Sequence, residues 1–394
     1  MPGRDQIDWP PDDELDALVR ELGQAGAATK LGISRGAVQS RVRERGLTST
    51  RDRAKTTPKP GSEVSEVEIL RQRVTELEGE RRRERKGEVF DERIAAAVEN
   101  AIATREPKYS PRSIPKSQRS GSKHEFVLLF SDLHAGEVVS REETNGINAY
   151  DWAIMLKRLD KIRQALFSYQ DNRPYPIERL HIAALGDQLS GDIHDELVAT
   201  NEIPLAEATV QLGLDTAEWI ESLTERFRKI TFSGVVGNHP RAHKKPWAKQ
   251  GYDNADWTSY NVTRLALRGN KTISFDIPKA SQHPITVAGK RILLWHGDGV
   301  RSTMPGVPWG GIMRRVNVLE SQYASAGLAI DHFACGHFHQ GNVVDGGRIL
   351  MNGSVKGVDE YSLKAFGGGR PPQQLLLTFH PRNGLTDASF LDCP

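Results

Sequence analysis

The sequence contains little cysteine and no long apolar run. Of its 394 residues only two are cysteines, Cys335 and Cys393, which is too few for a disulfide framework and is typical of a reducing compartment. No uninterrupted apolar stretch approaches the roughly 20 residues that a membrane-spanning helix needs. The opening stretch MPGRDQIDWPPDDELD also lacks the apolar centre of a signal peptide. We therefore expect a cytoplasmic protein that makes no use of a membrane.

The formal net charge is also small, at +2. The basic residues are nevertheless unevenly distributed along the chain. Between Arg41 and Lys59, seven basic residues face two acidic ones, and between Arg105 and Lys123 six face one. Stretches of this kind occur in solvated linkers. They are equally compatible with electrostatic attachment to a polyanion such as DNA, because each neutralised phosphate releases counterions.

The residues before the first basic stretch favour DNA as that polyanion. An amphipathic helix is expected to bury Leu15, Leu18, Val19 and Leu22, followed by a small-residue helix AGAATKLG and a turn at Gly32-Ile33. Ser34 then suits the N-cap of a third helix. This pattern resembles the helix-turn-helix of small bacterial and phage DNA-binding segments. Six residues are predicted to contact DNA: Ser34, Arg35, Gln39, Arg41, Arg43 and Arg45. A packing or oligomerisation module is the alternative.

Three regions follow from composition. Residues 1–50 form the helix-turn-helix-like segment, residues 51–123 a basic, helical and Pro/Ser-rich linker, and residues 124–394 a second domain. Residues 63–104 are predicted to be helical. Their row of regularly spaced apolar residues ends after about two heptads, short of the three or four that indicate a coiled coil. Homodimerisation through this helix and a solvated spacer are both compatible with that row.

Five short apolar runs in the second domain each end on a residue suited to bind a metal. They read HEFVLLFSDLH, RLHIAALGD, ITFSGVVGNH, RILLWHGD and IDHFACGHFH. Runs of this length, broken by Gly, Asn or Asp, are typical of buried strands that lead into loops. Strands of one sheet that stop at the same edge would gather eight side chains: Asp132, His134, Asp187, Asn238, His239, His296, His337 and His339. Carboxylate, imidazole and amide donors together suit Mn, Fe, Zn or Ni.

The motifs Asp-x-His, Gly-Asp, Gly-Asn-His, His-Gly-Asp and Gly-His-x-His follow one another in that order. The ordered set resembles the calcineurin-like metallophosphoesterase superfamily over roughly residues 124–390. The resemblance implies an α/β (α+β) fold, a β-sandwich flanked by helices. It also implies two divalent metal ions, with manganese as the first choice and Fe, Zn or Ni as the others.

The resemblance further assigns a part to each motif residue. One ion would be held by Asp132, His134 and His339. The other would be held by Asn238, His296 and His337. Asp187 would bridge both ions, and His239 would protonate or hydrogen-bond the leaving oxygen.

Two positions depart from the family pattern. Pro240 stands where many relatives have an acid after Gly-Asn-His, and Ser190 stands where many have an Asp that orients the acid histidine. Asp192 is the nearest substitute, and a solvated loop acid is the equal alternative. The segment GDQLSGD also lacks the Asp-Arg-Gly ending of phosphoprotein phosphatases, which argues against that branch.

The loop after His239 mixes cations with aromatics, as in HPRAHKKPWAKQGYDNADW. Five of its residues are predicted to bind substrate: Arg241, His243, Lys244, Lys245 and Trp247. This composition suits phosphates and stacked bases, although a surface loop packed on its own aromatic residues would look similar. The sequence therefore predicts a dimetal phosphodiesterase, a DNA nuclease or DNA-end-processing enzyme tethered by its N-terminal module. The alternatives are a phosphatase or phosphodiesterase for small or protein phosphoesters, and a non-catalytic DNA-binding protein with a structural metal site.

Overall fold

The computed structural model describes residues 9–44, 121–245, 251–300, 306–366 and 368–394, together with Ala103 and Arg119. The chain divides into two compact units, residues 1–84 and 85–394. The predicted spacer helix at 63–104 and most of the Pro/Ser-rich linker lie outside the described residues. Each unit is described by itself below.

The first unit contains two helices, α1 (Asp12–Lys30) and α2 (Arg35–Glu44), joined by a short turn. The prediction of two separate helices before this turn was wrong, because Gly26 alone does not interrupt a run of helix-forming residues. The predicted cap is confirmed, since Ser34 Oγ accepts a hydrogen bond from Ala37 N at 3.2 Å. Leu22 is 42% exposed, so it lies outside the core in which it was expected. That core contains Leu15, Val19, Ala27, Ala28, Val38 and Val42.

The second unit is built on two mixed β-sheets. One has six strands in the order β11-β10-β1-β2-β3-β4, and the other has five in the order β5-β6-β7-β9-β8. The strands of the first sheet are β1 (His124–Phe130), β2 (Ile177–Ala184), β3 (Lys229–Gly234), β4 (Ile273–Asp276), β10 (Gln373–His380) and β11 (Gly384–Asp392). Those of the second are β5 (Gln282–Val287), β6 (Lys290–Trp295), β7 (His332–Cys335), β8 (Asn342–Val344) and β9 (Ile349–Met351).

All five predicted strands are present, as β1, β2, β3, β6 and β7. They are divided between the two sheets, however, so the expectation that they share one sheet was wrong. Strands β1 to β4 are parallel neighbours, and β6 is parallel to β7 and β7 to β9. Because parallel strands end on the same side of a sheet, the loops that follow them meet at one edge of each sheet.

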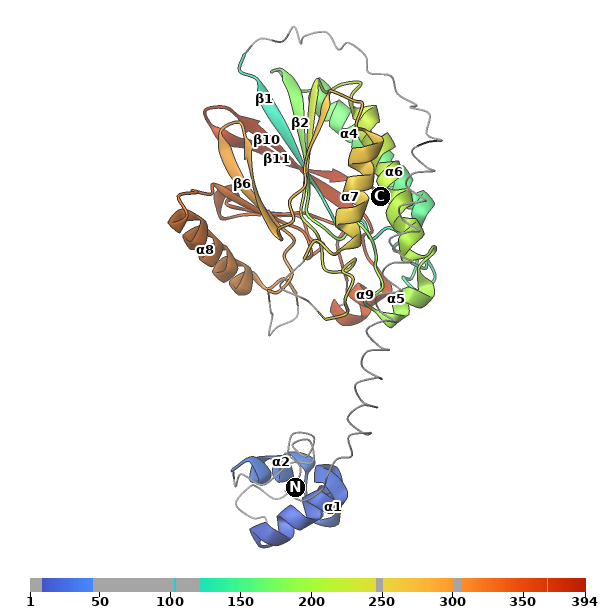
Figure 1. The fold of residues 1–394 in the computed structure, drawn as a ribbon, viewed down its shortest axis with the longest axis vertical. Coiled ribbons are helices and arrows are strands. Elements are labelled where there is room, and N and C mark those ends of the chain that lie inside the picture. The colour runs from blue at the N-terminus through green and yellow to red at the C-terminus, as the bar shows by residue number, and fades with distance from the viewer. Residues whose placement is uncertain are drawn as a thin grey trace, which may run out of the picture. The chain divides into compact units, whose positions relative to one another are not determined.

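Helices cover the outer face of each sheet, which gives four layers (Figure 1). The helices α4 (Trp152–Asp171), α6 (Leu205–Leu223) and α7 (Ala255–Ala266) pack on the first sheet, and α8 (Trp309–Ser325) packs on the second. The unit also contains two short helices, α5 (Asp195–Thr200) and α9 (Glu360–Phe366), and a 3₁₀ helix at Asp345–Gly347. None of the helices in the described residues is long and apolar enough to cross a membrane.

The alternation of side chains along β1 shows how the layers are joined. Phe126, Leu128 and Phe130 pack into the core under α4, α6 and α7. Val127 and Leu129 point the other way, into the core between the sheets. Both faces of this strand are buried, as expected of a central strand in a covered sheet. The α/β sandwich flanked by helices that was predicted as the fold class is therefore confirmed.

Candidate metal centre

The residues predicted to bind metal follow the carboxyl ends of strands from both sheets. Asp132 and His134 follow β1, Asp187 follows β2, and Asn238 follows β3. From the second sheet, His296 follows β6, and His337 and His339 follow β7. The two predicted halves of the centre therefore come from facing sheets.

The backbone of these loops is unusual. Among the described residues, eight that are not glycine have a positive φ, and five of them are predicted ligands. These are Asp132, His134, Asp187, His337 and His339. A left-handed backbone is uncommon for such side chains and tends to occur at functional sites, where surrounding structure holds it in place.

The first group of donors contains Asp132, His134 and His339. The Nε2 atoms of His134 and His339 lie 3.0 Å apart, and His339 Nε2 lies 3.4 Å from Asp132 Oδ1. Asp132 is held from behind, because Ser131 Oγ donates to its Oδ2 at 2.5 Å. The His337 backbone N–H also donates to Asp132 Oδ1, at 3.0 Å, which connects this group to the second sheet.

The second group contains Asp187, His296 and His337. His296 Nε2 lies 3.0 Å from Asp187 Oδ2 and 3.1 Å from the side-chain oxygen of Asn238. The other ring nitrogen, His296 Nδ1, donates to the Leu185 carbonyl at 2.7 Å, which aims Nε2 at the centre. Asp187 also belongs to a third group, with His134 and His239. It thus lies between the two predicted ion positions.

These donors fit divalent cations in their protonation as well as in their placement. Burial, and then the charge of His296, lowers the pKa of His337 to about 4. Burial, and then Lys356, holds the pKa of His134 well below its ordinary value. Both imidazoles are therefore neutral near pH 7 and keep a lone pair for a metal. Burial lowers the pKa of His296, but Asp187 outweighs it and raises that pKa to about 10, so a proton and a cation compete there.

Glycines let the loops of the centre touch. A Cβ on Gly237 would lie 2.1 Å from Asp187 Oδ1, and one on Gly336 would lie 2.4 Å from Asp132 Oδ2. Any side chain at either position would displace a predicted ligand. The glycines of the Gly-Asn-His and Gly-His-x-His motifs are thus required by close packing against the carboxylates.

Asp256 in the first turn of α7 braces two of these loops from behind. Its carboxylate accepts from Gln188 N at 3.0 Å and from Gly237 N at 2.9 Å. Burial, and then the charge of Asp187, raises the pKa of Asp256 to about 7, while the two N–H bonds oppose this. The side chain is fully buried, so neither backbone donor can turn to solvent instead.

The Asp256→Asn variant should therefore be less stable than the parent. An amide has one acceptor oxygen, so one of the two buried N–H groups would face an NH₂ donor and lose its bond. We expect the free energy of unfolding to fall by roughly 1–3 kcal/mol. Urea unfolding followed by circular dichroism measures this, with Asp253→Asn, an exposed acid nearby, as the control. Equal stability of both variants would mean that Asp256 does not brace the loops.

His239 is oriented by a backbone group. Its ring Nδ1 lies 3.1 Å from the Ser190 carbonyl, and its backbone N–H donates to Asp187 Oδ1 at 2.8 Å. The Ser190 carbonyl thus takes the orienting part that was expected of a carboxylate side chain. Asp192, predicted as the substitute, is exposed and does not occupy this position. The His194 ring lies 5.4 Å from that of His239, between centroids.

The loop after His239 uses its arginine internally. The guanidinium of Arg241 donates to the carbonyls of Asn238, His243 and Lys244 at 2.9, 2.8 and 2.7 Å. These bonds shape the loop, and substrate binding by Arg241 stays a prediction. Lys244 pairs with Asp195 at 2.8 Å, and Lys245 is exposed. His243 lies 3.7 Å from Asp253, and Trp247 lies outside the described residues.

Five of the six residues predicted to contact DNA lie at the start of α2 or on it. Ser34 and Gln39 are exposed. Arg41 is half-buried, with its guanidinium 5.5 Å from the centre of the Trp9 ring. Arg45 lies outside the described residues, as do the side chains of Arg35 and Arg43. DNA binding by this unit stays a prediction.

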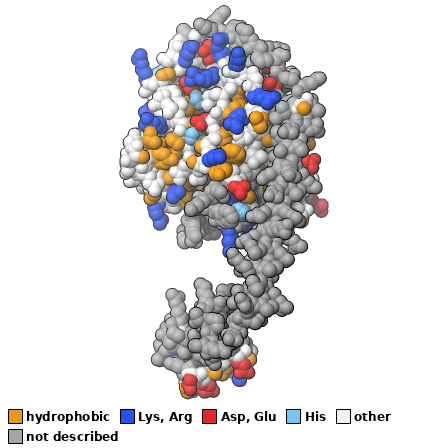
Figure 2. Space-filling view, viewed as in Figure 1, with side chains coloured by type: hydrophobic (Ala, Val, Ile, Leu, Met, Phe, Trp, Pro, Cys, Tyr) orange, Lys and Arg blue, Asp and Glu red, His pale blue; other side chains and the backbone are white. Residues whose placement is uncertain are grey.

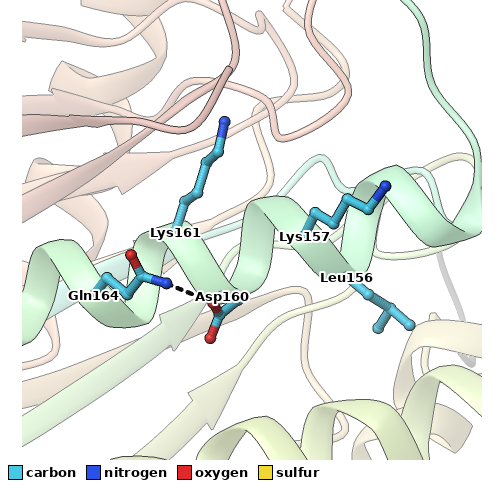
Figure 3. Close-up of a pocket in the computed structure, with 5 residues that line it drawn as sticks. All are labelled: Leu156, Lys157, Asp160, Lys161 and Gln164. Carbon is cyan, nitrogen blue, oxygen red and sulfur yellow. Dashed lines mark hydrogen bonds between the residues drawn. The ribbon is translucent and has the colours of Figure 1, made fainter.

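A hollow on the outer face of α4 is separate from the centre. Figure 3 shows its lining, in which Gln164 Nε2 donates to Asp160 Oδ2 at 2.6 Å. Its lining residues are Leu156, Lys157, Asp160, Lys161 and Gln164. All belong to one helix, and none is a metal donor of the groups above.

Several buried residues around the centre were missed in the sequence. They include Asp256, and also Glu137, Lys356 and Asp359, which form a charged cluster beside His134. A charged lysine in the otherwise apolar or small segment NGSVKGV was the one available signal. Its partner Asp359 follows three positions later, but Glu137 lies 219 positions away, too far for any local pattern to reveal it.

No protein-family model matches the chain, and no curated protein matches its sequence. Among solved structures it is similar to vacuolar protein sorting 29 from Cryptosporidium parvum, at 14% identity and a TM-score of 0.29, covering 68% of this chain and 96% of that one. It is similar to the Zn²⁺ complex of that protein from Entamoeba histolytica, at 13% identity and a TM-score of 0.28, covering 68% and 99%. An archaeal phosphodiesterase matches at 12% identity and a TM-score of 0.29, covering 67% and 98%. At these TM-scores the likeness carries no argument of its own.

Proposed function

We propose that the chain is a dimetal phosphoesterase that hydrolyses phosphodiester bonds, with DNA as its substrate. One observation carries the proposal: two groups of His and Asp donors meet at the ends of facing sheets, with Asp187 between them. Held there, two divalent ions would supply Lewis-acid stabilisation of charge on the phosphate oxygens and would acidify water. Manganese is the first choice, and Fe, Zn or Ni suit the same donors.

The side chains near the centre favour direct attack by water. Ser131 Oγ is buried and donates to Asp132, so it is not available as a nucleophile. Burial raises the pKa of the Cys335 thiol well above its ordinary value, which keeps the thiol protonated. A covalent intermediate on either residue is therefore not part of the proposal.

His239 is proposed to assist the leaving group. Because its Nδ1 donates to the Ser190 carbonyl, its Nε2 is the nitrogen left to serve the departing oxygen. The ring meets that of His134 edge-on at 4.6 Å between centroids, so it stands at the border of the donor groups. That position suits a proton donor or hydrogen-bond donor to the leaving oxygen.

DNA as substrate is supported by charge and exposure. The chain carries dense basic stretches at 41–59 and 105–123, and Ser34 and Gln39 are exposed on the first unit. On the face of the second unit drawn in Figure 2, Lys and Arg side chains lie scattered among apolar and uncharged ones. A separate basic tether would therefore add to the affinity for a polyanion.

A small phosphoester is the second candidate, and the loop after His239 favours it. Three of the five N–H groups of Arg241 are already bonded within the loop. Tyr252 and Trp257 pack against each other at 5.8 Å between centroids, and Lys279 lies 4.7 Å from the Tyr252 ring. The loop therefore has fewer cations and aromatic faces available for phosphates and bases than its composition alone indicates.

A substrate panel tests the proposal. The purified chain with Mn²⁺ should cleave labelled duplex, single-stranded or circular DNA, and also bis-p-nitrophenyl phosphate. Hydrolysis of p-nitrophenyl phosphate alone would favour the second candidate. No hydrolysis with Mn, Fe, Zn or Ni, together with retained DNA binding, would indicate a non-catalytic DNA-binding protein with a structural metal site.

Removing the first unit should separate DNA binding from chemistry. Residues 119–394 contain every proposed metal ligand and the three apolar clusters of the second unit, so we expect them to fold alone. Turnover of bis-p-nitrophenyl phosphate should stay within about twofold. DNA binding should weaken and depend less steeply on salt, because the cations of residues 35–59 and of residues 105–118 are gone.

Fluorescence anisotropy across a salt series measures the DNA affinity of both chains. Arg43→Ala with Arg45→Ala in the full chain should reproduce part of the weakening and leave small-substrate turnover unchanged. If the truncated chain binds DNA as tightly as the full chain at every salt concentration, the first unit is a packing or oligomerisation module.

A further inference from the structure

Three charged side chains are buried together beside His134. Glu137, Lys356 and Asp359 are 7%, 3% and 7% exposed. The Lys356 ammonium donates to Glu137 Oε1 at 2.8 Å and also to Asp359 Oδ2. We call these residues the lysine–carboxylate cluster. Burying three charges is costly even when they are paired. Two carboxylates and one ammonium also leave one negative charge without a partner. A role in stability alone therefore explains the cluster poorly.

The backbone around Lys356 is held firmly. Asn148 Nδ2 donates to the carbonyls of Lys356 and Val358, at 2.9 and 2.6 Å. Arg158 Nη1 donates to the Lys356 carbonyl at 2.7 Å. Ser354 Oγ accepts from Lys356 N at 3.0 Å and donates to the carbonyl of Asp132, a predicted ligand, at 2.7 Å. The ammonium is thereby fixed in front of Glu137 and tied to the metal centre.

Two unpaired buried atoms face each other across this cluster. His134 Nδ1 and Glu137 Oε2 are both buried, and neither has a hydrogen-bond partner among the described residues. They lie 3.7 Å apart, so a small rotation of either side chain would close a hydrogen bond. The other nitrogen of His134, Nε2, points at the donor group, 3.0 Å from His339 Nε2.

The chemistry of a ligand histidine explains this pairing. An imidazole that binds through Nε2 carries its proton on Nδ1, and that N–H needs an acceptor. Glu137 offers one oxygen to Lys356 and keeps the other for His134. Asp359 accepts a second hydrogen bond from the same ammonium, and no hydrogen bond or ion pair joins it to His134 among the described residues. The two carboxylates are therefore alike toward Lys356 and different toward His134.

We propose that Glu137 is a positioning residue that accepts the Nδ1–H of His134 and so aims Nε2 at the first ion, while Lys356 holds the carboxylate in place. The proposal rests on the proposed metal-binding function. Its rival is that Glu137 serves only to neutralise Lys356.

Matched variants of the full chain distinguish these explanations. Glu137→Gln and Asp359→Asn each remove one carboxylate from Lys356. Both should lower the stability of the chain by similar amounts. Only Glu137→Gln should weaken Mn²⁺ or Zn²⁺ binding at one site, by roughly 10–100-fold in a chelator competition. Asp359→Asn should stay within about threefold of the parent. Equal losses of metal affinity in the two variants would overturn the proposal.

A second pair removes the lysine charge altogether. In a Lys356→Met background neither carboxylate has an ammonium to neutralise, and each double variant keeps one buried carboxylate, so the two are matched in charge. Glu137→Gln should still weaken metal binding there, whereas Asp359→Asn should not. If the two double variants bind metal equally well, the only role of Glu137 is to neutralise Lys356. This pair decides the matter even if the single variant Glu137→Gln fails to fold.

Histidine tautomers give a readout that needs no metal. In the ¹⁵N-histidine-labelled chain treated with chelator, His134 should carry its proton on Nδ1 in the parent and in Asp359→Asn. Glu137→Gln should shift its population toward the Nε2–H tautomer, because the amide can donate to Nδ1. An unchanged tautomer would overturn the proposal. A parent chain that binds no metal, with the tautomer shift present, would contradict the proposed function and leave the Glu137–His134 contact standing.

Discussion

The Asp187→Asn variant is expected to bind less metal than the parent and to lose phosphoester hydrolysis. Asp187 belongs to two of the donor groups, and its two oxygens face His239 N and His296 Nε2 at 2.8 and 3.0 Å. A carboxylate can serve two cations with its two oxygens, whereas an amide offers one oxygen and no charge. The parent should contain about two ions per chain and the variant fewer.

Metal analysis after gel filtration, together with hydrolysis of bis-p-nitrophenyl phosphate, measures both effects. Asp160→Asn on α4 is a suitable control, because it removes one negative charge from the same unit and lies outside the donor groups. Circular dichroism should show the same fold in both variants. Undiminished metal content and turnover in Asp187→Asn would contradict the assignment of this site as a two-metal centre.

The His239→Asn variant is expected to keep both ions and to lose roughly 10²–10⁴-fold in turnover of a phosphodiester with a poor leaving group. The reason is that His239 contributes through its free Nε2, while Asn238 and His296 continue to supply donors. The asparagine side chain is too short to reach the leaving oxygen from the same backbone position.

A leaving-group series makes this test specific. The loss should shrink with p-nitrophenolate, because that anion departs with little need for a proton. A loss of the same size for methyl p-nitrophenyl phosphate and for a dinucleotide would instead assign His239 to substrate binding. A loss of metal would make it a ligand, as its grouping with His134 and Asp187 allows.

The apolar runs were sufficient to predict where the strands of the centre end. Each run is broken by Gly, Asn or Asp at the point where its strand stops, and those breaks carry Asp132, Asp187, Asn238, His296 and His337. Pairing between strands was not predictable, because a fully buried strand such as β1 shows the same apolar run whichever sheet contains it. The division of β1 and β6 between two sheets therefore appeared only in the structure.

Other features had no signature in the sequence at all. The group that orients His239 is the carbonyl of Ser190, and every residue type carries a carbonyl. Lys356 and Glu137 are 219 positions apart, so nothing local connects them. Arg241 was predicted to contact substrate, and its sequence context did not reveal that carbonyls of its own loop accept three of its N–H groups.

The arrival of ligands from both sheets has a thermodynamic consequence. An unfolded chain scatters the donors between Asp132 and His339, and only the assembled sandwich brings them within bonding distance of one another. The free energy of cation binding is therefore also free energy that holds the sheets against each other. By mass action, a hundredfold excess of cation over its dissociation constant would add about 2.7 kcal/mol to the free energy of unfolding. The melting temperature of the second unit should therefore rise with the concentration of free metal.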